Sequence, residues 1–345
     1  MTERIKTVRL RECAGPSCLD FIQPLFKNSP RRGKFAPAGF GCRRKPTKRR
    51  LGSLALWASF WAPMRIKAIQ DLSQLTDDAL FSEIAAGASL CLSNAQQIDG
   101  DSFLLNDLKR PAGSEILRLA AEEEAAKVLI LLDAVRCPRV ERQSDFNRQL
   151  QYFNDHLAKG IYAQYCWRRP HSFSAVREWV DRERKEYYLD GPNNVDWIFY
   201  NEILRQREET IYVDYVENDG AHYWHDPRCT DELKFMPPSS RSPTLQLVSA
   251  LSKAGCLKPG ALRILAKFWR AQAIDENLTV HALFDLNNNC LESLHAVGLL
   301  ETDDSGVITT IANRWLFPLY PLDLRKDRVS KDELRNIQRD WGFYE

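Results

Sequence analysis

The sequence lacks the local motifs of several common enzyme classes. Its 345 residues contain no Gly-x-Ser-x-Gly nucleophile elbow, no His-Glu-x-x-His metal pair and no glycine-rich phosphate loop. Each of these motifs places a nucleophile, a metal ion or a phosphate group at a defined turn or helix. Their absence excludes the hydrolases and nucleotide-binding proteins that depend on them.

A long apolar run is also missing. A membrane-spanning helix needs roughly 20 apolar residues, whereas the longest candidate, from Leu51 to Met64, has about 14. This stretch also begins about 50 residues into the sequence, which is too far for an ordinary signal peptide. We therefore expect no membrane segment.

Paired cysteine motifs do not occur either. Nine cysteines are scattered without a Cys-x2-Cys pair, which is typical of free thiols in a reducing compartment, so we expect a cytoplasmic protein. His222, His225 and Cys229 could be three zinc ligands, but a closed structural site needs a fourth. A loop in which Tyr223 and Trp224 pack on the protein core is the preferred interpretation. We predict no metal site and no cofactor.

Charge is distributed unevenly along the chain. Residues 1–50 hold 14 Lys and Arg against 3 Asp and Glu, whereas the remainder holds 34 against 43. The first part has no helical or strand period, so we expect residues 1–63 to be a disordered basic extension. A basic arm that contacts nucleic-acid phosphates and an extension without function are both open interpretations. A further hypothesis is that translation starts at Met64.

From residue 64 on, apolar residues recur at helical spacing, and the fold class is mainly α. The pattern predicts helices over 76–98, 112–136 and 145–167, and shorter ones near 174–186 and 195–209. Between Ile211 and Tyr215 apolar and polar residues alternate, which predicts an extended segment.

A Pro- and Ser-rich stretch, "MPPSSRSP", predicts a domain boundary near residue 240. Three helical patterns follow it, and then "ETDDSGVITTIANRWLF" predicts a β-hairpin that turns around Asp304. Residues 241–345 are therefore predicted to form a small C-terminal helical domain with the order of a winged helix. Its would-be recognition helix is acidic, so DNA binding is not expected and a protein-interaction role fits better.

Three consecutive glutamates lie in the most apolar helix, "RLAAEEEAAKVLILLDAV". On a helical projection Glu124 falls within the apolar stripe and Glu123 lies at its edge. A buried carboxylate requires a cation or a hydrogen-bond donor, so we expect partners from a neighbouring helix. Lys127, four residues after Glu123, predicts a local pair with it.

The predicted helix over 145–167 carries a complementary polar stripe. Three interpretations of the two stripes stay open. They form a structural polar network, or a catalytic site, or a solvated face. The network would comprise Glu123, Glu124, Lys127 and Asp155, with His156 and Lys159 opposite; the catalytic site would use His156, Arg148 and Lys159.

The order of these motifs resembles the AbiV family of bacterial abortive-infection proteins, within the HEPN superfamily. The resemblance is carried by "EEAAK" (Glu123–Lys127), then "HLAK" (His156–Lys159), then "ETIYVDYVENDG" followed by Trp and Pro. It covers roughly residues 77–237. It implies an antiparallel helical bundle over residues 64–237, often dimeric, which serves in defence against phage.

Many HEPN proteins are metal-independent ribonucleases in which an Arg and a His form an R-x4-6-H motif. The resemblance implies that the RNA 2′-hydroxyl attacks its own phosphate while His moves protons and Arg stabilises the developing charge. This chain departs from the motif, because seven residues separate Arg148 from His156. We therefore expect a phage-defence protein that acts through protein or RNA binding. The alternative is a ribonuclease that uses His156 with Arg148 or Lys159.

Partners follow from the same considerations. The resemblance implies a homodimer, and the expected macromolecular partner is RNA or a protein of the phage or host. Arg205, Arg207 and Tyr212 surround the start of the extended segment, and basic and aromatic side chains together predict an RNA contact. Packing with a solvated charged face is the alternative for these three residues.

Overall fold

The computed structural model describes residues 68–168, 170–186, 201–218, 221–227 and 242–330, together with 332, 333 and 336. The basic extension 1–63, Met64 and Cys229 lie outside the described residues, as does most of the stretch around the predicted domain boundary.

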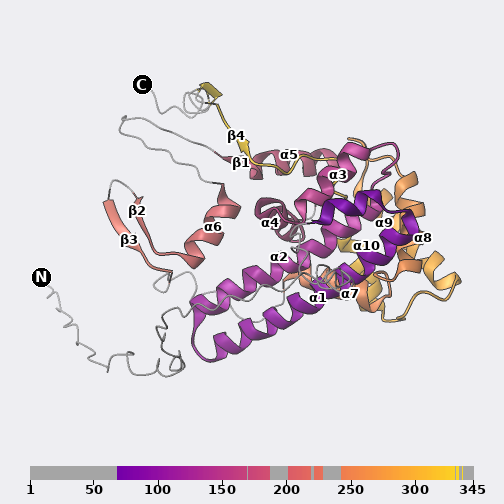
Figure 1. The fold of residues 1–345 in the computed structure, drawn as a ribbon, viewed down its shortest axis with the longest axis horizontal. Helices are drawn as coiled ribbons and strands as arrows, with labels where there is room; N and C mark the ends of the chain where they lie inside the picture. Colours follow the sequence, from indigo (N-terminus) through magenta and orange to yellow (C-terminus); the bar gives the residue numbers. More distant parts are fainter. Residues whose placement is uncertain are drawn as a thin grey trace, which may run out of the picture. The chain divides into compact units, whose positions relative to one another are not determined.

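The described chain is mainly α-helical, as the sequence predicts (Figure 1). Its helices are η2 (Ala68–Gln74), α1 (Asp77–Asp107), α2 (Pro111–Arg136), α3 (Gln143–Tyr152), α4 (His156–Tyr165), α5 (Phe173–Glu183), α6 (Glu202–Ile211), α7 (Pro243–Lys253), α8 (Pro259–Ala271), α9 (Val280–Ala296) and α10 (Ser305–Arg314). Two short strand pairs accompany them: β1 (Lys185–Glu186) runs parallel to β4 (Asp327–Arg328), and β2 (Asp214–Asn218) runs antiparallel to β3 (Ala221–His225). Of these described helices, none has both the length and the apolar character that crossing a membrane requires.

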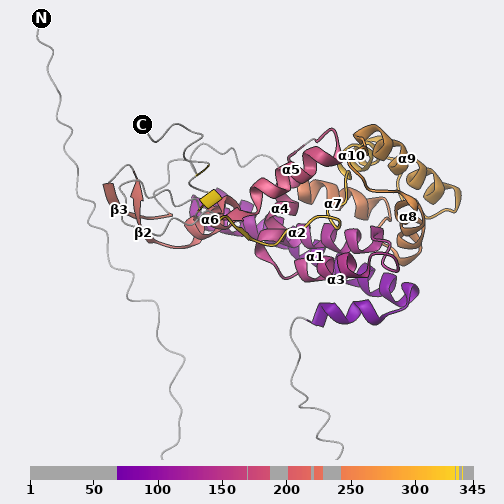
Figure 2. The same cartoon turned by 90° about the horizontal axis from the view of Figure 1, so that it is seen from above.

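The helix α2 lies at the centre of the packing. Pro111 occupies its first turn, where a missing N–H costs nothing, and Cys137 before Pro138 ends it in an extended conformation. The predicted helix over 112–136 is therefore confirmed. α2 contacts α1, α3, α4, α6, α7 and α8, and Figures 1 and 2 both show α1 alongside it.

The prediction of one helix over 145–167 is wrong, because α3 and α4 are separate helices. The chain turns at residues 153–155, and the Asp155 carboxylate accepts a hydrogen bond from the Ala158 amide at 2.9 Å. Asp is a favoured N-cap because its side chain satisfies an amide that a helix start leaves unpaired. Asp155, predicted as part of the polar network, thus acts as the cap of α4. Apolar spacing continues across the break, so periodicity alone misses it.

The β-hairpin predicted around Asp304 is also wrong. These residues begin α10, and the Asp304 carboxylate accepts a hydrogen bond from the Gly306 amide at 2.8 Å. The Asp-Ser-Gly sequence, which is typical of a tight turn, is here an N-cap. Val307 and Ile311, four residues apart, are buried on one helical face. The wing of a winged helix is therefore not formed by this segment.

The other C-terminal helices are confirmed as α7, α8 and α9. α7 and α8 contact both α1 and α2, and α10 contacts α7 and α9. Buried residues of α7 to α10 belong to the same hydrophobic cluster as those of α1, α2 and α4. The division of the chain near residue 240 stays a prediction.

A fully buried carboxylate lies within this core. Asp133 of α2 accepts a hydrogen bond from Arg136 Nε at 2.9 Å, and its second oxygen accepts from the Tyr162 hydroxyl and the Leu319 amide, both at 2.6 Å. Burial and the charge of Asp133 raise the pKa of Tyr162 well above its usual value, so the hydroxyl keeps the proton that it donates. We call Asp133, Arg136, Tyr162 and Leu319 the Asp133 network.

The Arg136 guanidinium extends this network to α8. It lies 4.4 Å from the ring centre of Trp269 and 4.9 Å from that of Trp315, and it donates to the Leu316 carbonyl at 2.8 Å. Cation–π contacts of a desolvated guanidinium are among the stronger ones. Helices α2, α4 and α8 and the chain after α10 therefore meet at one buried ion pair.

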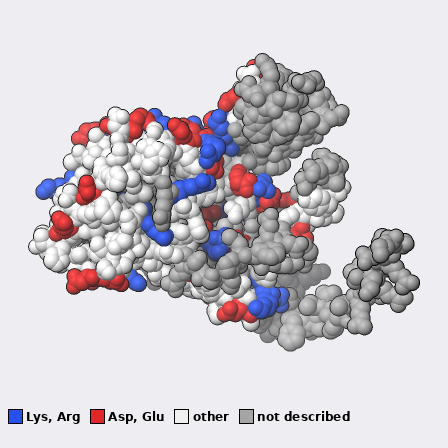
Figure 3. All heavy atoms as spheres, turned by 180° about the vertical axis from the view of Figure 1, so that it is seen from behind, with Lys and Arg blue, Asp and Glu red and all other residues white. Residues whose placement is uncertain are grey.

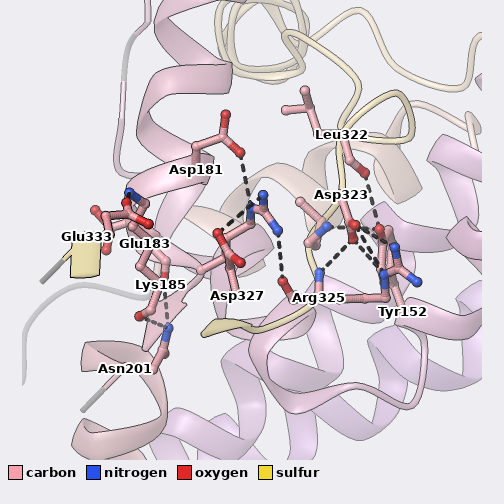
Figure 4. A network of polar contacts seen from close by, with 12 residues as sticks. Tyr152, Asp181, Glu183, Lys185, Asn201, Leu322, Asp323, Arg325, Asp327 and Glu333 are labelled. Atoms are coloured by element: carbon pink, nitrogen blue, oxygen red, sulfur yellow. Dashed lines mark hydrogen bonds and ion pairs between the residues drawn. The ribbon is translucent and has the colours of Figure 1, made fainter. Parts of the chain in front are cut away.

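The C-terminal segment 316–328 is fastened along much of its length. Beyond the Asp133 network, the Tyr152 hydroxyl of α3 donates to the Leu322 carbonyl at 3.2 Å and accepts from the Leu324 amide at 2.9 Å (Figure 4). The segment then pairs with β1 through β4. Segment 316–328, which has no helical pattern in the sequence, thus completes the hydrophobic core between the helices.

Replacing Asp133 with Ala is expected to lower the free energy of unfolding by about 3–5 kcal/mol, because the Arg136 charge and the Tyr162 hydroxyl stay buried without their acceptor. Urea denaturation followed by circular dichroism measures this loss. The control is Asp101→Ala on the exposed face of α1, which should change stability by no more than about 0.5 kcal/mol. Equal losses in the two variants would contradict the central role of Asp133.

Candidate functional site

Three helices meet at the carboxylate of Glu123 on α2. Its Oε2 accepts a hydrogen bond from the Lys159 ammonium at 2.7 Å and contacts His156 Nδ1 at 2.8 Å, both from α4. Its Oε1 lies 3.3 Å from Nε of Arg207 on α6. We call these four residues the Glu123 cluster. One negative charge thus links α2, α4 and α6.

The Glu123 cluster lies at the edge of the core. The Lys159 side chain is 7% exposed and the His156 side chain 48%, so the ammonium is enclosed while the imidazole reaches solvent. Burial alone would raise the pKa of Glu123, but the hydrogen bonds and charges of Lys159 and His156 outweigh burial and lower it. Glu123 is therefore anionic at neutral pH and holds both α4 side chains.

The two neighbouring glutamates have other partners. Glu122 is the most buried of the three; it pairs with Arg118 at 2.7 Å, and burial raises its pKa. Glu124, predicted to be the buried one, pairs with Lys127 one turn later. The predicted pair between Glu123 and Lys127 is wrong, because the Glu123 carboxylate contacts α4 and α6 and the Lys127 ammonium pairs with Glu124.

Arg148 and His156, the predicted catalytic pair, lie on different helices. Arg148 on α3 contacts Asp145 at 2.8 Å and donates to the Tyr320 carbonyl at 3.1 Å. It therefore faces the C-terminal segment, whereas His156 faces α2. The prediction that both side chains project from one continuous helix is wrong, while His156 and Lys159 do lie together, with 3.3 Å between Nδ1 and Nζ.

The helix α6 approaches α4 closely. Ile203 lies against Gly160, where a Cβ atom would come 2.2 Å from Ile203 Cγ2, so any larger residue would push α6 away. Asn201 caps α6 by accepting from the Leu204 amide at 3.2 Å, and its amide nitrogen donates to the Glu183 carbonyl at 2.6 Å (Figure 4). The sequence signals Asn201 only as an N-cap residue, and it gives no sign of the Gly160 contact.

The residues predicted to contact RNA face different directions. Arg205 pairs within α6 with Glu202 and Glu209, at 2.7 and 2.6 Å. Arg207, about 200° away around the helix, belongs to the Glu123 cluster. Tyr212 follows α6 and is exposed. Contact of these three residues with RNA stays a prediction.

An antiparallel hairpin follows α6 directly. The predicted extended segment is confirmed in part, since Ile211 still belongs to α6 and β2 begins at Asp214. Tyr215 of β2 lies opposite Trp224 of β3, and their ring centres are 5.1 Å apart. Trp224 is 69% exposed, so the prediction that it packs on the core is wrong. The alternation of apolar and polar residues predicts the strand β2, but it does not predict which face of the hairpin is covered by other parts of the protein.

Cysteine and metal chemistry find little support among the described residues. Burial raises the pKa of Cys91 to about 11 and that of four other free thiols to about 12, so these five stay protonated at neutral pH. Within the described ranges, no three His, Cys, Asp or Glu side chains gather as metal ligands would. The four other thiols are Cys137, Cys166, Cys256 and Cys290.

Replacing Glu123 with Gln is expected to lower the free energy of unfolding by about 1–3 kcal/mol at pH 7, because the enclosed Lys159 ammonium loses its counter-charge. Folding lowers the pKa of Glu123 below its ordinary value of 4.5. Its contribution is therefore complete above about pH 4.5 and is lost as the pH falls through the folded-state pKa. The gap between wild type and variant, measured by urea denaturation, should shrink in acid.

Glu124→Gln is the matched control, because that carboxylate pairs only locally and such pairs contribute about 0.2–0.5 kcal/mol. A gap for Glu123→Gln that stays constant from pH 7 to pH 3 would contradict the ionic role assigned to Glu123.

Comparison with known proteins agrees with the sequence motifs. Residues 83–235 match the family model HEPN_AbiV, described as AbiV. The match begins within α1, includes the Glu123 cluster and the hairpin, and ends before α7. No curated protein and no solved structure matches the chain. The chain therefore carries, over residues 83–235, a HEPN domain of AbiV, an abortive-infection family of phage defence.

Proposed function

We propose that the protein acts in phage defence by binding a macromolecular partner through α6 and the β2–β3 hairpin. The observation that carries this proposal is the contrast between the two ends of that unit. α6 is fixed to α2 and α4 by Arg207 and Ile203, whereas Tyr215 and Trp224 of the hairpin stay exposed. A fixed base with exposed aromatic rings suits binding, since a preorganised surface loses little conformational entropy.

The charges visible on one face of the described chain favour a binding role over an RNA-processing one. On the face drawn in Figure 3, Lys and Arg side chains are scattered among Asp, Glu and uncharged residues. Proteins that hold RNA through its phosphates gather basic side chains on one surface. In the Glu123 cluster, Lys159 and Arg207 both contact the Glu123 carboxylate.

A metal-independent ribonuclease that uses His156 with Lys159 is the second candidate. The half-exposed imidazole and its position 3.3 Å from the Lys159 ammonium favour it. In such a reaction the RNA 2′-oxygen bonds to phosphorus and gives its proton to His156. The bond from phosphorus to the 5′-oxygen breaks, and the leaving oxygen takes a proton from water. A 2′,3′-cyclic phosphate and a 5′-hydroxyl result, and His156 returns its proton to the solvent. Lys159 would stabilise the charge on the phosphoryl oxygens.

Phage plating tests the binding proposal. Bacteria that express the full chain are expected to reduce plaque formation by a sensitive phage, and the double variant Tyr215→Ser/Trp224→Ser should restore it to the level without the protein. Trp167→Ser is the control, because Trp167 is similarly exposed, at 56%, but lies outside the hairpin. Full protection by the double variant at equal expression would contradict the proposal.

Incubation of the purified protein with total bacterial RNA in EDTA tests the second candidate. The binding proposal predicts intact RNA. Fragments that end in 2′,3′-cyclic phosphate and disappear with His156→Ala would instead establish the ribonuclease. Comparison of the melting temperatures of wild type and His156→Ala shows whether a loss of cleavage reflects unfolding.

A further inference from the structure

The hairpin β2–β3 presents two aromatic rings on one face. Tyr215 and Trp224 are directly opposite each other in the antiparallel register, with ring centres 5.1 Å apart and ring planes inclined by 51°. The His222 ring lies 5.9 Å from Tyr215 on the same face. We call this set the aromatic face. Cross-strand aromatic pairs stabilise a two-stranded hairpin, which is marginal alone, so the rings are held in place before any partner arrives.

The aromatic face is open to solvent. Tyr215 is 60% exposed and Trp224 69%. Tyr and Trp are the residue types that most often dominate the binding energy of protein interfaces. Five of the large apolar side chains with high exposure fall between residues 212 and 224, namely Tyr212, Val213, Tyr215, Tyr223 and Trp224. Tyr215 and Trp224 share the aromatic face, whereas Tyr223, next to Trp224 in β3, points to the other face of the hairpin. Both faces of the hairpin therefore expose aromatic side chains.

The charge around the aromatic face is negative. Within residues 202–227, the side chains that the structure describes include five Asp and Glu against two Arg. Both arginines already have carboxylate partners: Arg205 pairs with Glu202 and Glu209, and Arg207 contacts Glu123. Asp214, which precedes Tyr215 in β2, is exposed, and its side chain lies on the opposite face of the strand. An approaching polyanion is repelled here, and a cationic group is attracted.

We propose that the aromatic face binds an arginine-rich segment of a protein partner. Guanidinium groups stack on the faces of Trp and Tyr and gain both cation–π attraction and apolar contact. The surrounding carboxylates supply the electrostatic complement and select basic segments over acidic ones. This inference rests on the proposed function, since it names the partner of the same surface.

Single-stranded RNA also stacks on aromatic rings, but its phosphates would meet the acidic residues that flank them. The two partners therefore make opposite predictions about charge. Removal of an acidic residue strengthens RNA binding and weakens binding of an arginine-rich segment.

The test uses the full chain and three fluorescein-labelled probes: a ten-residue Arg-Ser repeat, a ten-residue Glu-Ser repeat and a ten-residue oligouridine. Fluorescence anisotropy is expected to show tightest hairpin-dependent binding for the Arg-Ser peptide. Its affinity should fall at least tenfold in Tyr215→Ser/Trp224→Ser and stay within twofold of wild type in Trp167→Ser. Equal affinity in wild type and the double variant would overturn the proposal.

A charge variant tests the proposal independently, in case the double variant weakens binding only because its hairpin no longer folds. Asp214→Lys retains both rings, and it should weaken Arg-Ser binding at least threefold. Unchanged or stronger Arg-Ser binding in this variant would overturn the proposal. So would an oligouridine affinity that exceeds the peptide affinity and falls in the double variant.

Phage plating separates this inference from the proposed function. If Tyr215→Ser/Trp224→Ser abolishes protection while the Arg-Ser peptide fails to bind, the partner has another chemistry and the binding function stands. If neither protection nor peptide binding depends on the hairpin, both proposals fall.

Discussion

The structure depends on the burial of one ion pair, Asp133 with Arg136. Two charges taken out of water cost several kcal/mol each, and their attraction offsets this only when further hydrogen bonds satisfy the remaining atoms. Here the Tyr162 hydroxyl, the Leu319 amide and the Leu316 carbonyl do so. Each of these groups comes from a segment other than α2. The ion pair therefore specifies where α4 and the C-terminal segment must lie.

A second carboxylate, Glu123, repeats this principle nearer the surface and positions α6. It stands ten residues before Asp133 on α2, and it joins α4 and α6 as Asp133 joins α4 and the C-terminal segment. Two of its partners, His156 and Arg207, reach solvent in part, whereas Asp133 is wholly enclosed. Because of this difference in burial, the Asp133 network is a fixed support inside the core, and the Glu123 cluster is a junction between helices at the surface.

The sequence predicts those features that are encoded within a few residues. α2 could be predicted almost to the residue, because Pro111 and the Cys137–Pro138 step act locally. The break before α4 and the start of α10 are also local, but Asp155 and Asp304 are compatible with both a turn and an N-cap, and only packing decides. The residues that contact Glu123 lie 33 to 84 residues away in the sequence. Helical periodicity therefore predicts that a buried carboxylate needs a partner, but it does not identify which residues the partners are.

The close packing of α6 explains why a surface hairpin can be a usable binding element. A two-stranded hairpin by itself is marginally stable, and ordering it upon binding would consume affinity. Ile203 of α6 packs directly against Gly160 of α4, and any side chain at residue 160 would prevent this close contact. The Asn201 side chain at the start of α6 donates a hydrogen bond to the Glu183 carbonyl of α5. His225 Nε2 at the end of β3 lies 3.2 Å from the Glu209 carbonyl of α6. The hairpin is thus joined to α6 at both ends, and the orientation of its rings follows from helix packing.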